Sequence, residues 1–242
     1  MSARLARRFK VGGVVRTLLR QISTILILAG LMLLADVGLT LVWQEPVSAI
    51  YADWRQNALA DDLDDLSVPD LEPAEVEALE RLPLDEDRAA FLARALKRRT
   101  DAGDPIGRIR IPEIGATKVV VEGTDGGSLR KGPGHYPETP LPGIRGTVAI
   151  AGHRTTYGAP FRDLDKLEQR DEVIVDMPYG RFVYRVERAQ IVDPTATWVT
   201  RRVRHDRLVL TACHPLYSAA QRIVIFARLQ RAEELAWTSV RT

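Results

Sequence analysis

The stretch Arg207-Leu-Val-Leu-Thr-Ala-Cys213-His-Pro215 contains the only cysteine of the 242-residue chain. The residues before Cys213 are apolar, β-branched or small, a pattern that predicts an extended strand. Pro215 cannot continue a sheet, so we expect the strand to end beside Cys213. A second apolar run, 222–229, predicts the next strand and begins with Arg222. Cys213 and Arg222 would then lie at neighbouring strand ends.

This segment alone leaves the role of the cysteine open. A lone free cysteine is more often a small buried residue than a nucleophile. With one cysteine the chain forms no intramolecular disulfide. A membrane segment, a histidine motif and Arg222 shift the interpretation towards a reactive thiol.

The overall composition, 45% hydrophobic and 27% charged, is that of an ordinary globular protein. Its charges are segregated along the chain. Residues 1–21 hold six basic side chains and no acid, whereas residues 44–104 hold 16 acids and 7 bases, a net charge of 7 − 16 = −9. This acidic segment argues against a nucleic-acid-binding surface.

An apolar segment follows the basic residues. Ile22 to Trp43 is 22 residues long with a single charge, Asp36. A helix of that length spans about 33 Å, enough to cross a bilayer. We expect a basic cytoplasmic tail (1–21), an uncleaved transmembrane anchor (22–43) and an extracellular remainder, because basic flanks stay in the cytoplasm.

The next segment, 44–103, is predicted to be an acidic, partly helical stalk. Helical patterning covers 75–82 and 85–99, with Pro83 between them. The acidic run 61–65 lacks the glycine and distal glutamate of a calcium loop, so we interpret it as a solvated turn. The histidines are not at ligand spacings, and we expect no metal and no cofactor.

Residues 104–230 are predicted to form an all-β domain, a sandwich or closed barrel, followed by a tail at 231–242. Short β-like runs are separated by Gly and Pro, with little helical pattern between them. The longest interruption, 123–146, is rich in Gly and Pro, and loops of that length are often functional. The eight predicted strands are 106–111, 117–121, 147–151, 172–176, 182–191, 197–200, 208–212 and 222–229.

Four histidines are candidate partners for the thiol. His153 follows the apolar run 148–151 and so emerges at a strand end, as Cys213 does. His214 is a poorer partner, because neighbours along a strand point to opposite faces. His205 lies in a very basic turn and is expected to be solvated, and the role of His135 stays open.

Three dispersed motifs resemble those of the sortases, the membrane-anchored cysteine transpeptidases of Gram-positive bacteria. They are Ala151-Gly-His-Arg-Thr-Thr-Tyr-Gly-Ala-Pro-Phe161, Leu210-Thr-Ala-Cys-His-Pro215 and Arg222. The run Gly132-Pro-Gly-His-Tyr-Pro137 and the Cys-His-Pro sequence most resemble class E of actinobacteria. The usual Thr-Leu-x-Thr-Cys has Val209 and Ala212 in place of its threonines, a departure that bears on substrate contact rather than on the nucleophile.

The resemblance implies an eight-stranded sortase-type β-barrel and a mechanism. Cys213 would be the nucleophile, His153 the acid/base and Arg222 the residue that stabilises the oxyanion. The partners implied are secreted proteins with a C-terminal sorting signal of the Leu-Ala-x-Thr-Gly or Leu-Pro-x-Thr-Gly kind, cleaved after Thr, and an amine of the cell-wall precursor. The residues expected in the substrate groove are Tyr136, Thr155, Thr156 and Ala212, although Tyr136 packing its loop and the two threonines satisfying their turn remain alternatives.

Two other functions fit the same residues. Water in place of the amine would make the protein a membrane-anchored cysteine peptidase. Alternatively, the protein is not an enzyme but a membrane-tethered β-domain that only binds a partner, and Cys213 is inert.

Overall fold

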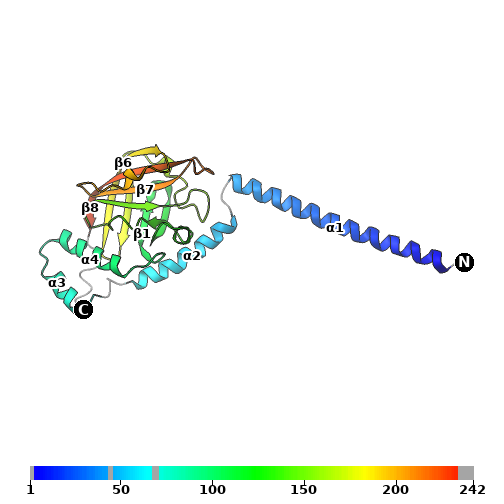
Figure 1. The fold of residues 1–242 in the computed structure, drawn as a ribbon, viewed down its shortest axis with the longest axis horizontal. Helices are drawn as coiled ribbons and strands as arrows, with labels where there is room; N and C mark the ends of the chain where they lie inside the picture. Colours follow the sequence, from blue (N-terminus) through cyan, green and yellow to red (C-terminus); the bar gives the residue numbers. More distant parts are fainter. Residues whose placement is uncertain (1–2, 43–45, 67–70, 234–242) are drawn as a thin grey trace. The chain divides into compact units, whose positions relative to one another are not determined.

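The computed structural model describes residues 3–42, 46–66 and 71–233 (Figure 1). The chain divides into two compact units, residues 1–46 and 47–242. The first unit contains helix α1 (Ala3–Val42), and the second contains all other helices and strands of the described chain.

Helix α1 is long and apolar. Its segment Val15–Gly38 has 24 residues and a mean hydropathy of 2.0, and by length and composition it is able to cross a membrane. At 1.5 Å per residue it spans about 36 Å. The predicted segment, 22–43, is shifted relative to this one, since the helix is continuous through Arg16 and Arg20. Trp43 lies outside the described residues.

The second unit is built on a closed eight-stranded β-barrel, which confirms the predicted fold class. The barrel closes because β1 pairs with both β2 and β5, and the order around it is β1-β2-β3-β4-β7-β8-β6-β5. The strands are β1 (Pro105–Ile111), β2 (Ala116–Glu122), β3 (Gly134–His135), β4 (Thr147–Ala151), β5 (Glu172–Met177), β6 (Gly180–Val192), β7 (Arg207–His214) and β8 (Gln221–Glu233).

One predicted strand is wrong, and one strand was missed. Residues Thr197–Thr200 form a 3₁₀ helix, η3, whose Trp198 stacks on Phe226 with ring centroids 6.1 Å apart. Trp198 and Val199 therefore pack on the outer face of the barrel, and the segment does not form a strand. Strand β3 lies inside the Gly- and Pro-rich segment predicted to be a loop, and it pairs in parallel with β2 and antiparallel with β4.

Strands β7 and β8 are apolar on both faces. Alternate residues Leu208, Leu210 and Ala212 of β7 belong to the main core cluster inside the barrel. Val209 belongs to a second cluster on the outer face, together with Val224 and Phe226 of β8. Burial on both faces explains why these strands read as continuous apolar runs.

Short helices precede the barrel and pack on it. Helix α4 (Asp85–Arg99) has the predicted bounds, and α3 (Pro73–Glu80) replaces the predicted 75–82. Leu92 and Leu96 of α4 and Leu79 of α3 join the main core cluster. This part of the predicted stalk therefore shares the core of the barrel.

Helix α2 (Pro46–Asp65) runs beside the barrel near β1 and β2 (Figure 1). Leu59 and Leu63 pack on Val119 and Val121 of β2. The Gln56 amide accepts from the Val119 N–H at 2.7 Å and donates to its carbonyl at 3.1 Å, as an added strand would. The acidic residues 61–65 form the last turns of this helix, not a separate solvated turn, because Leu63 anchors them to β2.

Candidate active site

Cys213 and Arg222 lie directly opposite each other in the β7–β8 ladder. Residues paired in this way have Cβ atoms about 4.5–5.5 Å apart on the same face of the sheet. Both side chains are half-buried. Alternation along β7 puts Cys213 on the outer face with Val209 and Thr211, away from the barrel interior.

His153 reaches the same end of the sheet from β4. Strands β4 and β7 are parallel, and Ala151 is in register with Thr211. The Gly152 N–H donates to the Thr211 carbonyl at 3.0 Å, which continues the pairing past the end of β4. His153 and Cys213 each follow this registered pair by two residues, so β4, β7 and β8 bring all three predicted catalytic residues to one end of the barrel.

The environment of His153 favours its neutral form. Burial lowers the pKa of the imidazole from the usual 6.5, and the positive charge of Arg130 lowers it further. The ring also contacts Tyr157, with centroids 5.2 Å apart and planes tilted by 46°. Arg130 in turn lies 6.0 Å from the centroid of the Tyr157 ring. Sequence reasoning gave no role to Tyr157, although it lies in the same motif as His153, and it missed Arg130, which only the fold brings to His153.

The guanidinium of Arg222 is held by backbone carbonyls of the β7–β8 loop and of the first residue of β8. Its Nη1 donates to the carbonyls of Ala219 and Gln221 at 3.0 and 2.9 Å. Strand β8 is flanked by β6 and β7, so Arg222 is not on an edge strand. Among the described residues no salt bridge involves Arg222, although its neighbours along β8, Arg228 and Arg231, each form one. A guanidinium that keeps unshared N–H groups is suited to an oxyanion.

Tyr136 lies along the same outer face. Its ring packs against the cluster that contains Ala149 and Val209, and its hydroxyl is 3.0 Å from the Thr211 hydroxyl. Thr211 and Cys213 are two residues apart on the same face of β7. The Tyr136 side chain therefore lies on the surface that leads along β7 to the Cys213 thiol. Packing of the loop and contact with a substrate are compatible at this position.

The other predicted groove residues divide between loop and core. Thr155 and Thr156 are half-buried in the loop after β4, where the Thr156 carbonyl accepts from the Ala159 N–H at 2.9 Å and closes a turn. Ala212 is 4% exposed and belongs to the core inside the barrel. Ala212 therefore points away from the face that carries Cys213, because adjacent strand residues face opposite sides.

The remaining histidines have other partners. His135 is 1% exposed, and its Nδ1 is 2.8 Å from a carboxylate oxygen of buried Glu122, so it fastens the long loop to β2. His214 contacts the buried Arg154 on the side of β7 opposite Cys213, as alternation predicts. Sequence reasoning also missed Arg154, although it adjoins His153.

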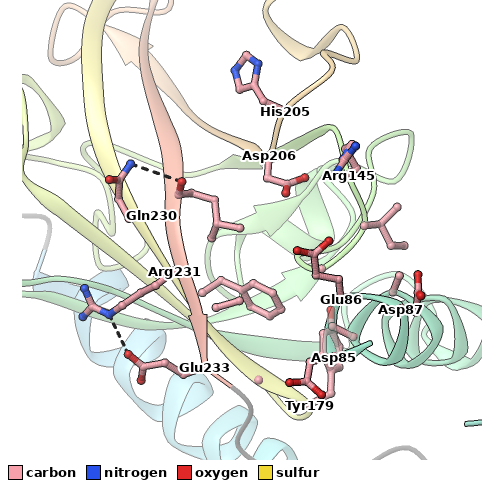
Figure 2. Close-up of a pocket in the computed structure, with 18 of the residues that line it drawn as sticks. Asp85, Glu86, Asp87, Arg145, Tyr179, His205, Asp206, Gln230, Arg231 and Glu233 are labelled. Carbon is pink, nitrogen blue, oxygen red and sulfur yellow. Dashed lines mark hydrogen bonds and ion pairs between the residues drawn. The ribbon is translucent and has the colours of Figure 1, made fainter. Parts of the chain in front are cut away.

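His205 lines a cavity of about 820 Å³ at the other end of the barrel (Figure 2). The wall comes from the first turns of α4, the segment before β7 and the last residues of β8. Glu86, Asp206 and Arg145 are among its charged side chains (Figure 2). Strand β7 starts at this end, with Arg207, and leads to Cys213 at the other. The cavity is therefore separate from the candidate active site.

Comparison with known proteins supports one family. A family model described as "Sortase domain" matches residues 109–230, just over half of the chain. The chain is 34% identical over 132 residues to Sortase D of Bacillus subtilis (strain 168), which covers 53% of this chain and 65% of that protein. The chain spans 41% to 65% of the length of the curated relatives it matches.

Solved structures share the barrel. Sortase E from Streptomyces avermitilis is 33% identical, with a TM-score of 0.52, over 55% of this chain and 93% of that one. A Clostridium perfringens Sortase D5 transpeptidase is 26% identical, with a TM-score of 0.53, over 64% and 95%. Since the matched domain covers the whole barrel from β1 to β8 apart from its ends, the chain belongs to the sortase family.

Proposed function

We propose that this protein is a membrane-anchored cysteine transpeptidase. It would cleave a sorting signal after threonine, retain the acyl group on Cys213 and transfer it to an amine of the cell-wall precursor. The observation that carries the proposal is the pairing of Cys213 with Arg222 in the β7–β8 ladder, with His153 at the same end of the sheet. The D5 relative is itself described as a transpeptidase.

In the first half-reaction the thiol proton of Cys213 passes to neutral His153, and the sulfur attacks the threonine carbonyl carbon. Arg222 donates hydrogen bonds to the resulting oxyanion and keeps its own protons. As the C–N bond breaks, His153 returns the proton to the departing amine, which leaves a thioacyl-enzyme. The lowered pKa of His153 makes its imidazolium a stronger acid for this step.

The second half-reaction reverses these roles. An acceptor amine attacks the thioester carbon and gives a proton to His153, while Arg222 again stabilises the oxyanion. The carbon–sulfur bond then breaks, a new amide is formed, and the sulfur of Cys213 regains the proton from His153. Both the thiol and the imidazole return to their starting states.

The outer face of β4 and β7 is the proposed substrate groove. An extended peptide would lie along the side that carries Thr211 and Cys213, with Tyr136 beside it. A Leu-Ala-x-Thr-Gly signal, as in the class E resemblance, is the proposed substrate motif. Thr155 and Thr156 follow His153 in the flanking loop and complete the candidate contacts.

Helix α1 is the proposed membrane anchor. Its segment Val15–Gly38 has the length and hydropathy for a single crossing, and six basic residues lie within 1–21. The positive-inside rule then puts the N-terminus in the cytoplasm and the barrel outside the cell, where sorting signals and cell-wall amines are found.

Product analysis tests this function. The full chain in detergent is incubated with a Leu-Ala-x-Thr-Gly peptide, with and without a short glycine or diaminopimelate-type amine, and the products are identified by mass spectrometry. We expect an amide between threonine and the added amine, lost in Cys213→Ala. A product ending in free threonine even at saturating amine would identify a peptidase instead. Turnover that persists in Cys213→Ala would refute the nucleophile.

A further inference from the structure

A buried arginine joins the two segments that carry the candidate acid/base and nucleophile. Arg154 follows His153 in the chain and is only 2% exposed. Its Nε and Nη2 donate to the Arg162 carbonyl at 2.9 and 2.8 Å, and Nη2 lies 2.7 Å from an Asp165 carboxylate oxygen. Its Nη1 lies 3.3 Å from Nδ1 of His214.

This last contact lies behind the thiol. His214 is the last residue of β7 and pairs with Gln221, so the strand alternation still holds there. His214 therefore shares its face with Leu210 and Ala212, on the interior side of β7. Cys213 points to the opposite face. The Arg154–His214 contact thus holds the backbone on either side of the proposed reaction without occupying the groove.

The hydrogen-bond chemistry of the contact is specific. A guanidinium only donates, so Nδ1 of His214 must accept, and the proton of neutral His214 sits on Nε2. The other groups on Arg154 are a carbonyl and a carboxylate, both acceptors. A guanidinium this far removed from water requires such partners, and their directions fix its position.

We propose that Arg154 is a positioning residue for the transpeptidation. Through Nδ1 of His214 it links the loop after β4 to the end of β7, and so sets the separation of His153 and Cys213, each of which adjoins one partner in this contact. The proposal rests on the function proposed above. It assigns no contact between Arg154 and the substrate.

Substitutions at His214 test this link more cleanly than Arg154→Ala, which leaves buried acceptors unpaired and risks unfolding the loop. His214→Leu removes the acceptor and leaves the guanidinium and its other partners in place. His214→Asn restores an acceptor, because the amide oxygen of asparagine lies near the position of Nδ1. His205→Leu, at the opposite end of β7 in the wall of the cavity, is the matched control.

The full chain in detergent is assayed with a Leu-Ala-x-Thr-Gly peptide and an amine, and kcat and KM are determined separately, together with the thermal midpoint. We expect His214→Leu to lower kcat by roughly 10- to 100-fold, the size expected for a small misplacement of catalytic groups, with little change in KM. His214→Asn should recover most of kcat, and His205→Leu should match wild type. The rate of Cys213 alkylation by iodoacetamide should follow the same order as kcat.

The possible results of this assay distinguish failure of the positioning role from failure of the proposed transpeptidase function. A wild-type chain without Cys213-dependent turnover contradicts the function itself. A wild-type chain that turns over, with equal kcat in His214→Leu, overturns only the positioning role. Equal losses in the Leu and Asn variants would also overturn it, because the acceptor would then not matter. If His214→Leu does not fold, His214→Gln replaces it, since its amide oxygen lies near Nε2 and cannot substitute for Nδ1; wild-type kcat in that variant counts against the proposal.

Discussion

Arg222 lies directly across the β7–β8 ladder from Cys213, and its Nη1 is already bonded to the carbonyls of Ala219 and Gln221. The backbone therefore presets the direction of the guanidinium before any substrate binds. Preset donors are effective in catalysis because they need no reorganisation when charge develops. Within the described residues both carbonyls accept from Nη1, which leaves the N–H groups of Nε and Nη2 for the proposed oxyanion.

Replacing Arg222 should therefore affect turnover more than binding. We expect Arg222→Gln to lower kcat by roughly 10²- to 10³-fold, the loss typical of removing an oxyanion donor. The kcat of Arg222→Lys should lie between those of the wild type and Arg222→Gln, because an ammonium group keeps the charge but lacks the planar set of N–H donors. Steady-state kinetics on a sorting-signal peptide measures both. Arg228→Gln, an exposed position towards the other end of β8, is the control, and a wild-type kcat in Arg222→Gln would contradict the assignment.

The stability of the folded protein at acid pH depends in part on the protonation of His153. Burial and Arg130 lower its pKa, so its NMR titration midpoint should lie below 6.5. The exposed Arg130 is the smaller of these two causes, and Arg130→Gln should raise the midpoint only part of the way. The unfolded chain binds a proton at this site more readily, so the site favours unfolding as the pH falls below 6.5. A midpoint above 6.5, or one unchanged in Arg130→Gln, would contradict this description.

The hydroxyl groups of Tyr136 and Thr211 should be energetically coupled in a double-mutant cycle. Tyr136→Phe and Thr211→Val each remove one hydroxyl of the 3.0 Å contact. Each should lower the free energy of unfolding by about 1 kcal/mol, and the double variant should lose little more than either single one. Chemical denaturation of the full chain in detergent measures the cycle. Additive losses would show that the hydroxyls act independently.

The helices before the barrel should contribute to its stability. Leu92 of α4 is 3% exposed inside the main core cluster, so Leu92→Ala should cost about 2–5 kcal/mol of unfolding free energy. Ile191→Ala, which truncates a side chain that is 48% exposed, should cost far less. Denaturation followed by near-UV circular dichroism compares the two. Equal, small losses would mean that residues before the barrel act as a separate stalk.

Strands could be predicted from the sequence where both of their faces are buried along the whole length, because such strands are apolar or β-branched at nearly every position. Residues 148–151 are apolar, Thr147 before them is β-branched and buried, and β4 has the predicted bounds. The segment 197–200 has the same local preference for extended structure, yet it forms the 3₁₀ helix η3, whose Trp198 stacks on Phe226. Strand β3 has two residues, too few for any period, and exists only because β2 and β4 hold it on both sides.

The candidate site divides in the same way between local and long-range information. A proline after Cys213 and a glycine before His153 mark strand ends, so the sequence predicts where both side chains emerge. Their convergence depends on the parallel register of β4 and β7, which no local pattern specifies. Arg130 and Arg154 were missed for that reason, since their partners come from distant segments.

Intact-mass analysis of the acyl-enzyme tests the central claim most directly. The full chain is mixed with a Leu-Ala-x-Thr-Gly peptide without added amine, quenched in acid and analysed by mass spectrometry, with peptide mapping of the adduct. We predict a mass increase equal to the acyl fragment ending in threonine, located on Cys213 and discharged by an added amine. Product formation with no adduct on Cys213, or with the adduct on another residue, would contradict the account.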